Sequence, residues 1–314
     1  MNNNFWQKLP KPFVALAPME DVTDFVFREI VATTLPRPDV MFTEFTNVDA
    51  LSSSGYEKTI HRFKFSKEQH PIVAQIWGTN PEHFTKVAQI AEKFGFDGID
   101  INMGCPVRAV IKNGACSALI NNRPLVREII KATRNGTNKL PISVKTRIGF
   151  KDVETEDWIS FLLEQKLDAI TVHGRIAKQM SDVPANWEEI AKAVKIKNEI
   201  SPNTVIIGNG DVKNYIDVLG KHKKYGVDGI MIGRGIFSNP LVFDKTNKIH
   251  TLQENKQVLI KHLDLYKKTK ESNKAYGVMK KFFKMYIHGF EGANTLRAKL
   301  METKNVDEAF SILK

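Results

Sequence analysis

Cysteine is scarce in this chain, which has only Cys105 and Cys116 among its 314 residues. Two cysteines that lie so near each other in the sequence do not suggest the disulfide framework on which small secreted proteins depend. We therefore expect both thiols to be free and the protein to work in a reducing compartment, the cytoplasm.

Long hydrophobic runs are also missing. No stretch approaches the about 18 uninterrupted apolar residues that a membrane-spanning helix requires. The first residues, MNNNFWQKLPKPF, lack the apolar centre of a signal peptide. These two absences predict a soluble, cytoplasmic protein with no membrane partner, and nothing in the sequence indicates a protein partner, so we expect a monomer.

Basic residues are in excess, because the formal net charge is +11. Residues 245–314 hold 15 Lys or Arg against 7 Asp or Glu, so most of the excess lies in this tail. A basic surface is typical of proteins that bind a polyanion such as nucleic acid. A proteome rich in lysine and asparagine would produce a similar composition, but the uneven distribution favours a nucleic-acid partner.

Apolar runs alternate with helical stretches along most of the chain, which predicts a parallel sheet covered by helices. Eight such runs can be counted, and eight strands close a (β/α)8 TIM barrel within about 250 residues. The predicted strands are 14–19, 40–45, 71–77, 98–103, 141–147, 169–173, 204–208 and 229–233. The predicted helices are 25–32, 81–94, 123–134, 155–165, 187–196 and 213–223, and segment 46–70 is expected to be a long loop with a short helix.

From about residue 250 the pattern is wholly helical, so we predict a barrel domain over residues 1–245 and an all-helical domain over residues 246–314. One helical face of the tail is apolar and the other is basic. The apolar face is either a partner-binding stripe or, as we favour, a core-facing stripe. Its residues are Val278, Met279, Phe282, Phe283 and Tyr286, and the basic face carries Lys280, Lys281 and Lys284.

Cys105 follows the predicted strand 98–103, in the turn Met103-Gly-Cys-Pro106. The carboxyl ends of parallel strands are where α/β folds hold their ligands, so this cysteine is a candidate for chemistry. The alternative is a small apolar plug, because free cysteine is among the most buried residue types. The small residues of KNGACSALI, which follow, favour a backbone that lies close to something bound.

Two glycine-containing turns follow the seventh and eighth predicted strands, Gly208–Asp211 and Gly233–Gly235. In barrels this position commonly forms a phosphate site, since glycines let backbone N–H groups face the anion. Arg234 would add a full positive charge. The two turns together predict a phosphorylated ligand.

Polar side chains lie near the ends of three other strands: Gln75, Lys145 and His173. Lys145 has the charge that would stabilise the anionic reduced state of a flavin ring. Alternatively, Lys145 satisfies a neighbouring carboxylate, and His173 is a hydrogen-bonded histidine at the barrel mouth.

Together these motifs resemble the tRNA-dihydrouridine synthase family, whose signature is a similar Asn-x-Gly-Cys-Pro run followed by a glycine-rich segment and an Ala-Leu pair. Cys116 stands where the family usually has glycine, and we interpret it as a tolerated small residue. Met180 stands where an aromatic residue is common. The resemblance covers roughly residues 14–240, and it implies FMN as cofactor, NADPH or NADH as reductant, and tRNA as partner.

The resemblance also implies a role for individual residues, and it implies no metal site. Residues matching those that contact the flavin ring are Ala17, Pro18, Met19, Gln75, Lys145 and His173. Residues matching the FMN phosphate segment are Asn209, Gly210, Asp211, Gly233 and Arg234. Residues matching positions near the target uridine are Asn102, Arg175 and Gln179.

The reaction implied by the resemblance is reduction of a uridine in tRNA to 5,6-dihydrouridine, with hydride going from reduced FMN to C6 and a proton from Cys105 to C5. A thiol with an unperturbed pKa of about 8.5 is mostly protonated near neutral pH, as an acid must be. Two alternatives remain: a flavin barrel acting on a free pyrimidine, such as a dihydroorotate or dihydropyrimidine dehydrogenase, and a non-catalytic tRNA-binding protein. The sequence leaves open which uridine is reduced, and whether earlier modification of the tRNA is needed.

Overall fold

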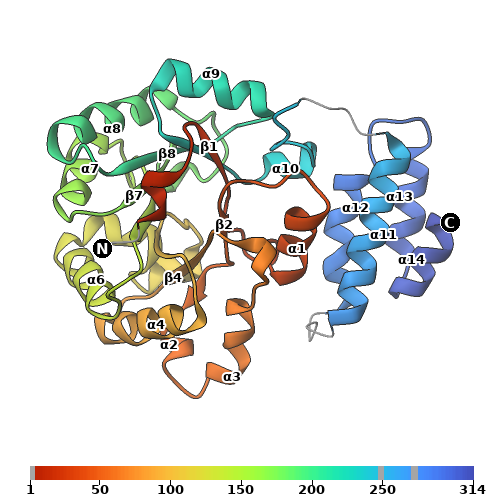
Figure 1. Cartoon of the computed structure of the whole chain (residues 1–314), viewed down its shortest axis with the longest axis horizontal. Helices are drawn as coiled ribbons and strands as arrows, with labels where there is room; N and C mark the ends of the chain where they lie inside the picture. The colour runs from red at the N-terminus through yellow and green to blue at the C-terminus, as the bar shows by residue number, and fades with distance from the viewer. Residues whose placement is uncertain (1–3, 247–250, 270–274) are drawn as a thin grey trace.

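The computed structural model describes residues 4–246, 251–269 and 275–314 of the chain. Its central element is a sheet of parallel strands in the order β1-β9-β8-β7-β6-β5-β4-β2. A bridge between Ala15 and Val40 brings the two ends of this order together, and Leu16 donates a backbone hydrogen bond to Val40 (N···O 3.0 Å). The fold is therefore the predicted (β/α)8 TIM barrel (Figure 1).

Six strands agree with the predicted ranges to within one residue, the first ends at Leu16 and not at residue 19, and the second is interrupted. In place of one strand over 40–45, β2 and the short β3 both pair with β4. Between them, the backbone N–H of Gln75 donates to the side-chain Oγ1 of Thr43 (3.1 Å), so a hydroxyl replaces a backbone carbonyl in the ladder. The strands are β1 (Phe13–Leu16), β2 (Met41–Phe42), β3 (Thr46–Asn47), β4 (Ile72–Trp77), β5 (Gly98–Met103), β6 (Ile142–Arg147), β7 (Ala169–His173), β8 (Val205–Asn209) and β9 (Gly229–Ile232).

The predicted helices surround the sheet, and most begin at an Asn or Asp side chain that caps the first turn. They are α1 (Phe25–Thr33), α4 (Pro81–Phe94), α6 (Arg123–Asn135), α7 (Thr155–Glu164), α8 (Trp187–Ile200) and α9 (Tyr215–Tyr225). Four short helices were not predicted individually. They are α2 (Val48–Leu51) and α3 (Tyr56–Thr59), where one short helix was predicted, and α5 (Arg108–Lys112) and α10 (Gly235–Ser238), where none was. Segment 46–70 therefore holds several short helices, where a long loop with one short helix was predicted.

The barrel has an apolar floor. Trp6, in a 3₁₀ turn before β1, is fully buried and packs on Phe13 and Phe42 at the amino ends of the strands. Burial of such large rings closes this end of the barrel, so the open end is the one at which the strands terminate.

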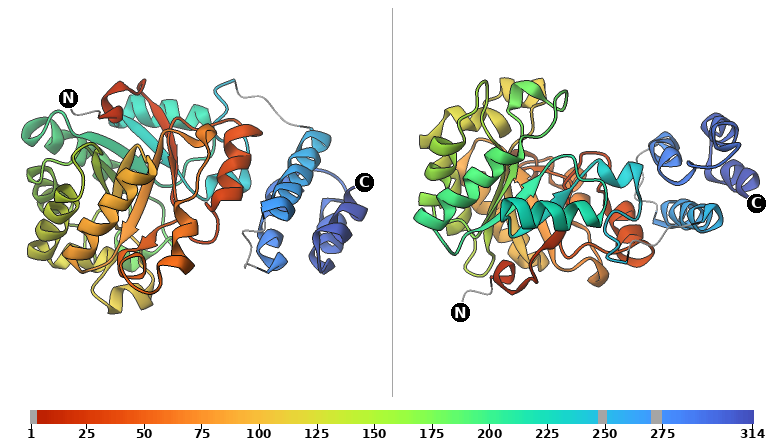
Figure 2. Two further views of the ribbon diagram at one scale, coloured as in Figure 1. Left: turned by 60° about the horizontal axis from the view of Figure 1, so that its bottom comes forward. Right: turned by 90° about the horizontal axis from the view of Figure 1, so that it is seen from above.

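Four further helices stand to one side of the barrel: α11 (Leu252–Thr269), α12 (Lys280–Tyr286), α13 (Ala293–Glu302) and α14 (Val306–Leu313) (Figure 2). The apolar stripe of the tail is a core-facing one, as we favoured, since Met279, Phe282, Phe283 and Tyr286 are buried. Phe282 stacks on Phe27 of α1, with ring centroids 5.0 Å apart. The predicted domain boundary at 245/246 stays a prediction, because residues 247–250 lie outside the described residues.

No helix among the described residues is both long enough and apolar enough to span a membrane.

Candidate functional site

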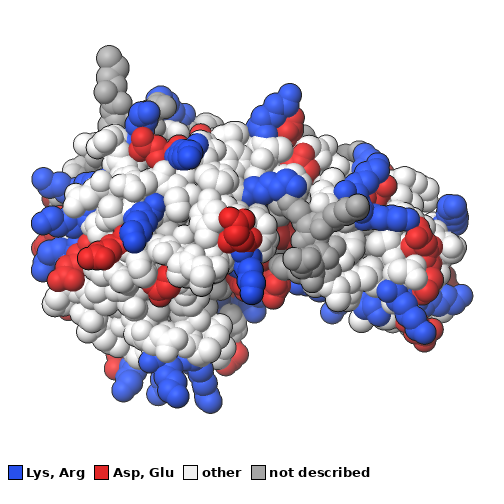
Figure 3. Space-filling view, turned by 90° about the horizontal axis from the view of Figure 1, so that it is seen from below, with Lys and Arg blue, Asp and Glu red and all other residues white. Residues whose placement is uncertain are grey.

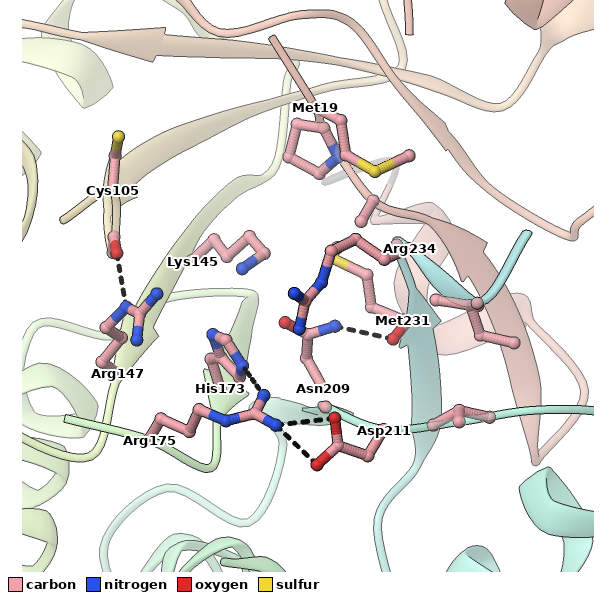
Figure 4. A pocket seen from close by; sticks show the side chains of 18 of the residues that line it. Met19, Cys105, Lys145, Arg147, His173, Arg175, Asn209, Asp211, Met231 and Arg234 are labelled. Carbon is pink, nitrogen blue, oxygen red and sulfur yellow. Dashed lines mark hydrogen bonds and ion pairs between the residues drawn. The ribbon is translucent and has the colours of Figure 1, made fainter. Parts of the chain in front are cut away.

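A pocket of about 740 Å³ opens at the carboxyl ends of the strands. It gathers residues from the first strand-end loop to the turn after β9, and Figure 4 shows their side chains converging on one space. Of the predicted site residues, the pocket is lined by Ala17, Pro18, Met19, Gln75, Asn102, Cys105, Lys145, His173, Arg175, Asn209, Gly210, Asp211, Gly233 and Arg234. Gln179 is the one predicted residue that does not line it.

The turn that carries Cys105 is held by Asn102. The side-chain Oδ1 of Asn102 accepts hydrogen bonds from the backbone N–H groups of Gly104 and Cys105, each 3.0 Å long. On the other side, Arg147 Nε donates to the carbonyl of Gly104 (2.7 Å). An amide and a guanidinium thus fix the turn, and the half-buried thiol remains at the pocket.

Cys116 contacts Cys105 through its thiol, which sequence reasoning did not anticipate. The hydrogen bond from Cys116, with the nearby charges of Arg147 and Lys145, outweighs burial and lowers the pKa of Cys105 to about 7. The same contact and burial raise the pKa of Cys116. Protonated and ionised Cys105 therefore coexist at neutral pH, whereas we expected a mostly protonated thiol. Cys116 has a φ of 52°, in the left-handed region that favours glycine, which gives a physical reason for glycine at this position.

Lys145 occupies the middle of the pocket, between Cys105 and Arg234 in the view of Figure 4. Within the part of the chain that the structure describes, no group accepts a hydrogen bond from its ammonium. Burial and the charge of Arg147 lower its pKa to about 8, although Asp100 and Cys105 oppose this shift. An ammonium in such surroundings attracts an anionic ligand.

His173 is neutral, because burial and the neighbouring positive charges of Lys145 and Arg147 lower its pKa. Its Nε2 accepts a hydrogen bond from Arg175 (2.9 Å), so the ring proton resides on Nδ1. Arg175 also donates to both carboxylate oxygens of Asp211, each at 2.6 Å, and to the carbonyl of Val183. The predicted uridine contact Arg175 and the predicted phosphate contact Asp211 therefore bind each other.

The turns after β8 and β9 form the other end of the pocket. Asn209 Nδ2 donates to the carbonyl of Met231 (2.8 Å), which ties the two turns together. Gly210 has a φ of 131°, and a Cβ there would lie 2.5 Å from the Cβ of Ala185. Only glycine therefore fits this turn, because Ala185 fills the space of a side chain, and Gly210 itself lines the pocket.

The pocket is strongly cationic. Five basic side chains line it, and Asp211 is the one acidic side chain that does so among the described residues; the five are Lys145, Arg147, Arg175, Lys213 and Arg234. Because Asp211 is paired with Arg175, most of the positive charge is available to a ligand. A phosphorylated molecule of flavin size fits this charge, this volume and the glycine at position 210.

Arg147 is a site residue that sequence reasoning missed. It follows Lys145 by two positions on β6, and side chains two apart in a strand lie on the same face, so strand alternation alone could have found it. Besides Gly104, its guanidinium donates to the carbonyls of Ile176 (3.0 Å) and Met180 (2.8 Å). It thereby links the Cys105 turn to the loop after β7.

Gln179 and Met180 belong to that loop. The amide oxygen of Gln179 accepts a hydrogen bond from the backbone N–H of Ile176 (3.1 Å), so this side chain stabilises its own loop and does not line the pocket. Met180 is exposed, with its side chain outside the pocket lining. The predicted contact of Gln179 with a uridine stays a prediction.

One acidic group in the described part of the chain has the spacing of a metal site: Glu20, Asp21 and Glu44, whose oxygens lie within 4.8 Å of one another. Glu20 forms an ion pair with Arg62 (2.6 Å), and Glu44 accepts from the backbone N–H of Asp21 (2.8 Å). These contacts account for part of the acidic charge without an ion.

Comparison with known proteins places these features in a family. Residues 15–314 match the dihydrouridine synthase (Dus) family. One similar relative is the probable tRNA-dihydrouridine synthase of Staphylococcus aureus (strain Mu50), and another is the probable tRNA-dihydrouridine synthase 2 of Bacillus subtilis (strain 168). Each is 45% identical to this chain over 316 residues. Each match covers 100% of this chain, with 95% of the Staphylococcus protein and 96% of the Bacillus protein. A solved structure, histamine dehydrogenase from Rhizobium sp. 4-9, has a TM-score of 0.55 at 12% identity; the match covers 80% of this chain and 48% of that one, and it shows the fold alone.

Proposed function

The chain belongs to the dihydrouridine synthase family, and from this premise we propose that it reduces uridines in tRNA to 5,6-dihydrouridine, with FMN as cofactor and NADPH or NADH as reductant. One observation carries the proposal: Cys105 and Lys145 line the same pocket as the two glycine-containing turns. An acid, a central cation and a phosphate cradle in one space are what flavin-dependent reduction of a base requires.

The residues that would hold FMN divide by chemistry. Asn209, Gly210, Gly233 and Arg234 would hold the phosphate, and Lys145 would face the pyrimidine edge of the ring. Ala17, Pro18, Met19, Gln75 and His173 would contact the rest of the ring. When bound and reduced, FMN would supply the hydride that adds to C6 of the uridine. Asp211 contributes by neutralising Arg175, which leaves Arg234 as the cation for the phosphate.

Cys105 would give its proton to C5 of the uridine. Cys105 lies on the side of Lys145 opposite Arg234 in Figure 4 and lines the pocket, so a substrate placed over the ring end of the cofactor would lie beside it. Asn102 and Arg147 hold the Cys105 turn in place for this step. Because the pKa of Cys105 is about 7, the acid form is lost as the pH rises above neutrality.

A uridine must leave the stacked tRNA to reach this pocket, so the enzyme would extrude it and hold it beside Asn102 and Cys105. We propose that the helical region, predicted as residues 246–314, holds the tRNA body by its phosphates and shape. On the face drawn in Figure 3, Lys and Arg side chains are scattered over both the barrel and the helical region, with Asp and Glu among them. The prediction of a monomer rests on the sequence alone.

The test is anaerobic. Purified protein is reduced with NADPH, tRNA lacking dihydrouridine is added, and the flavin absorbance band is followed. We expect tRNA to reoxidise the flavin and free uridine or uracil not to do so. Reoxidation by the free pyrimidine alone would instead favour a free-pyrimidine reductase, and protein that binds no FMN would overturn the flavin assignment.

A further inference from the structure

A row of polar side chains crosses three neighbouring strands, and Gln75 at one end of the row lines the pocket. The sheet register places Gln75 of β4 beside Asp100 of β5, and Asp100 beside Ser143 of β6. Asp100 is fully buried and does not line the pocket. Its Oδ2 accepts a hydrogen bond from Gln75 Nε2 (2.8 Å) and its Oδ1 accepts one from Ser143 Oγ (2.6 Å).

A series of hydrogen bonds connects Asp100 to the Cys105 turn through Gln75 and Asn102. Gln75 turns its Nε2 to Asp100, so its Oε1 is free to accept from Asn102 Nδ2 (3.1 Å). Asn102 then has its Oδ1 left to accept from the backbone N–H groups of Gly104 and Cys105. In this series of hydrogen bonds, every donor lies on the Cys105 side and every acceptor on the Asp100 side.

The donor-to-acceptor direction of these hydrogen bonds depends on an acceptor at position 100. Backbone N–H groups can only donate, so Asn102 must present its oxygen to the turn and its NH₂ to Gln75. Gln75 must then present its NH₂ to position 100, where a carboxylate can only accept. If that acceptor is removed, a buried amide NH₂ loses its partner, and a flipped Gln75 would face Asn102 donor to donor.

We infer that Asp100 is a positioning residue for the proposed reaction: its carboxylate fixes the orientation of the Gln75 amide and, through Asn102, holds the Cys105 turn so that the thiol faces the pocket. Asp100 touches neither the pocket nor the thiol and acts only through these two amides. The inference rests on the proposed function for its activity measurement but not for its thiol measurement.

Keeping the Asp100 carboxylate ionised in the protein interior costs free energy, and this cost agrees with a functional role. Burial raises the pKa of Asp100 to about 6, although Ser143, Gln75 and Lys145 favour its ionised form. A carboxyl group whose pKa is raised by folding contributes stability at low pH, and that contribution is lost as the pH rises through about 6. At neutral pH, folding therefore gains nothing from the ionised Asp100. Buried carboxylates of this kind concentrate at functional sites.

Two substitutions of Asp100 separate the role of its acceptor oxygen from the roles of its charge and size. Asp100→Asn keeps an oxygen for Gln75 and can turn its NH₂ to Ser143 Oγ, so the hydrogen bonds keep their direction without the charge. Asp100→Leu has a similar size and no acceptor. Asp228→Asn is the control for loss of a buried carboxylate away from the pocket lining, because Asp228 accepts from the backbone N–H of Ile206 (2.9 Å) and forms an ion pair with Lys11 (2.6 Å).

The holoenzyme variants are compared in two measurements. The first is the rate of Cys105 alkylation by iodoacetamide against pH, with the modified cysteine located by mass spectrometry. The second is single-turnover reoxidation of the reduced flavin over a range of tRNA concentrations. Misplacement of a reacting group by about 1 Å costs on the order of 100-fold in rate. We expect Asp100→Leu to lose about this factor at saturating tRNA, with an unchanged tRNA concentration dependence and a shifted alkylation profile.

We expect Asp100→Asn to stay within a few-fold of wild type in both measurements, and Asp228→Asn to match wild type. Equal losses in the Asn and Leu variants would overturn the inference, because charge and not the acceptor would then matter. Wild-type behaviour of folded Asp100→Leu would overturn it as well. If that variant does not fold, Asp100→Ala takes its place with the same two outcomes. Failure of wild type to react with tRNA counts against the proposed function alone, since alkylation still tests Asp100.

Discussion

The barrel and the helical region bury different kinds of side chain. At the open end of the barrel, polar groups such as Asn102, Arg147 and Arg175 are buried and held by specific hydrogen bonds. The helical region buries mostly apolar side chains, and it joins the barrel through the rings of Phe282, Phe27 and Phe237. Among the described residues, none beyond Asn239 lines the pocket.

If the helical region holds tRNA as proposed, this difference separates chemistry from substrate recruitment. Directional hydrogen bonds hold reacting groups in place, whereas apolar packing holds one part of the molecule against another without selecting a reaction. The two regions meet near the pocket mouth, where Lys281 donates to the carbonyl of Asp21. Changes in the barrel should therefore affect the reaction, and changes in the helical region should affect only how tRNA reaches it.

The largest effect should come from Cys105→Ala. A positioned general acid contributes roughly 100- to 10,000-fold, so reoxidation of the reduced flavin by tRNA should slow by about that factor. FMN affinity should stay unchanged, because the phosphate turns lie at the other end of the pocket. Stopped-flow absorbance and a flavin titration measure the two quantities. A Cys105→Ala enzyme as fast as wild type would show that another group is the acid.

Phe282→Ala tests how far apolar packing joins the two regions. Removing a buried phenyl ring costs about 3–5 kcal/mol, and here the ring stacks on Phe27 and Phe237 of the barrel. We expect calorimetry to resolve two thermal transitions, with the helical region melting first and the barrel keeping its FMN.

The matched control for that variant is Phe84→Ala, because Phe84 is an equally buried ring on α4 within the barrel. This variant should lose similar stability but unfold in one transition, at a lower temperature. A single transition in both variants would mean that the two regions form one cooperative unit.

Cys116→Ala should change the pH dependence of the barrel chemistry. The Cys116 hydrogen bond is the largest cause of the low pKa of Cys105, so its loss should raise that pKa above about 7. Cys105 would then stay protonated to higher pH, and the fall in the rate of reoxidation by tRNA at alkaline pH should move to higher pH. A shift of about one pKa unit would raise the rate at pH 8 by about fivefold. Cys116→Ser keeps a hydrogen-bond donor and should shift the pH dependence less. An unchanged pH dependence in the alanine variant would show either that Cys116 does not lower the pKa of Cys105 or that another group is the titrating acid.

The smallest effect should come from Lys284→Gln, which removes one exposed charge from α12. Loss of a single phosphate contact should weaken tRNA binding a few-fold and reduce the slope of log K against log salt by about one. Lys131→Gln, an exposed lysine on α6 of the barrel, is the control and should leave that slope unchanged. Equal effects of both variants would mean that tRNA binds by diffuse charge and not through the helical region.

Local signals in the sequence were sufficient for most of the elements. Helix α4 begins and ends where predicted because Asn80 caps it, Pro81 starts it and Gly95 ends it in the left-handed conformation. The cysteine turn and the glycine turns could also be located, because each follows an apolar strand directly. The interruption between β2 and β3 could not be located from the sequence, because it depends on a hydrogen bond between the Thr43 hydroxyl and the backbone of another strand.

The sequence by itself determined most of the strands, six of the barrel helices, the apolar stripe of the tail and 14 of the 25 residues that line the pocket. Local patterns in neighbouring residues of the chain are sufficient to predict such features. Only the tertiary structure decided how those residues bind one another. Arg175 reaches Asp211, Gln75 reaches Asp100, and Cys116 reaches Cys105. These contacts depend on strand register and on the course of loops, and both are set by packing of the closed barrel and not by any local pattern.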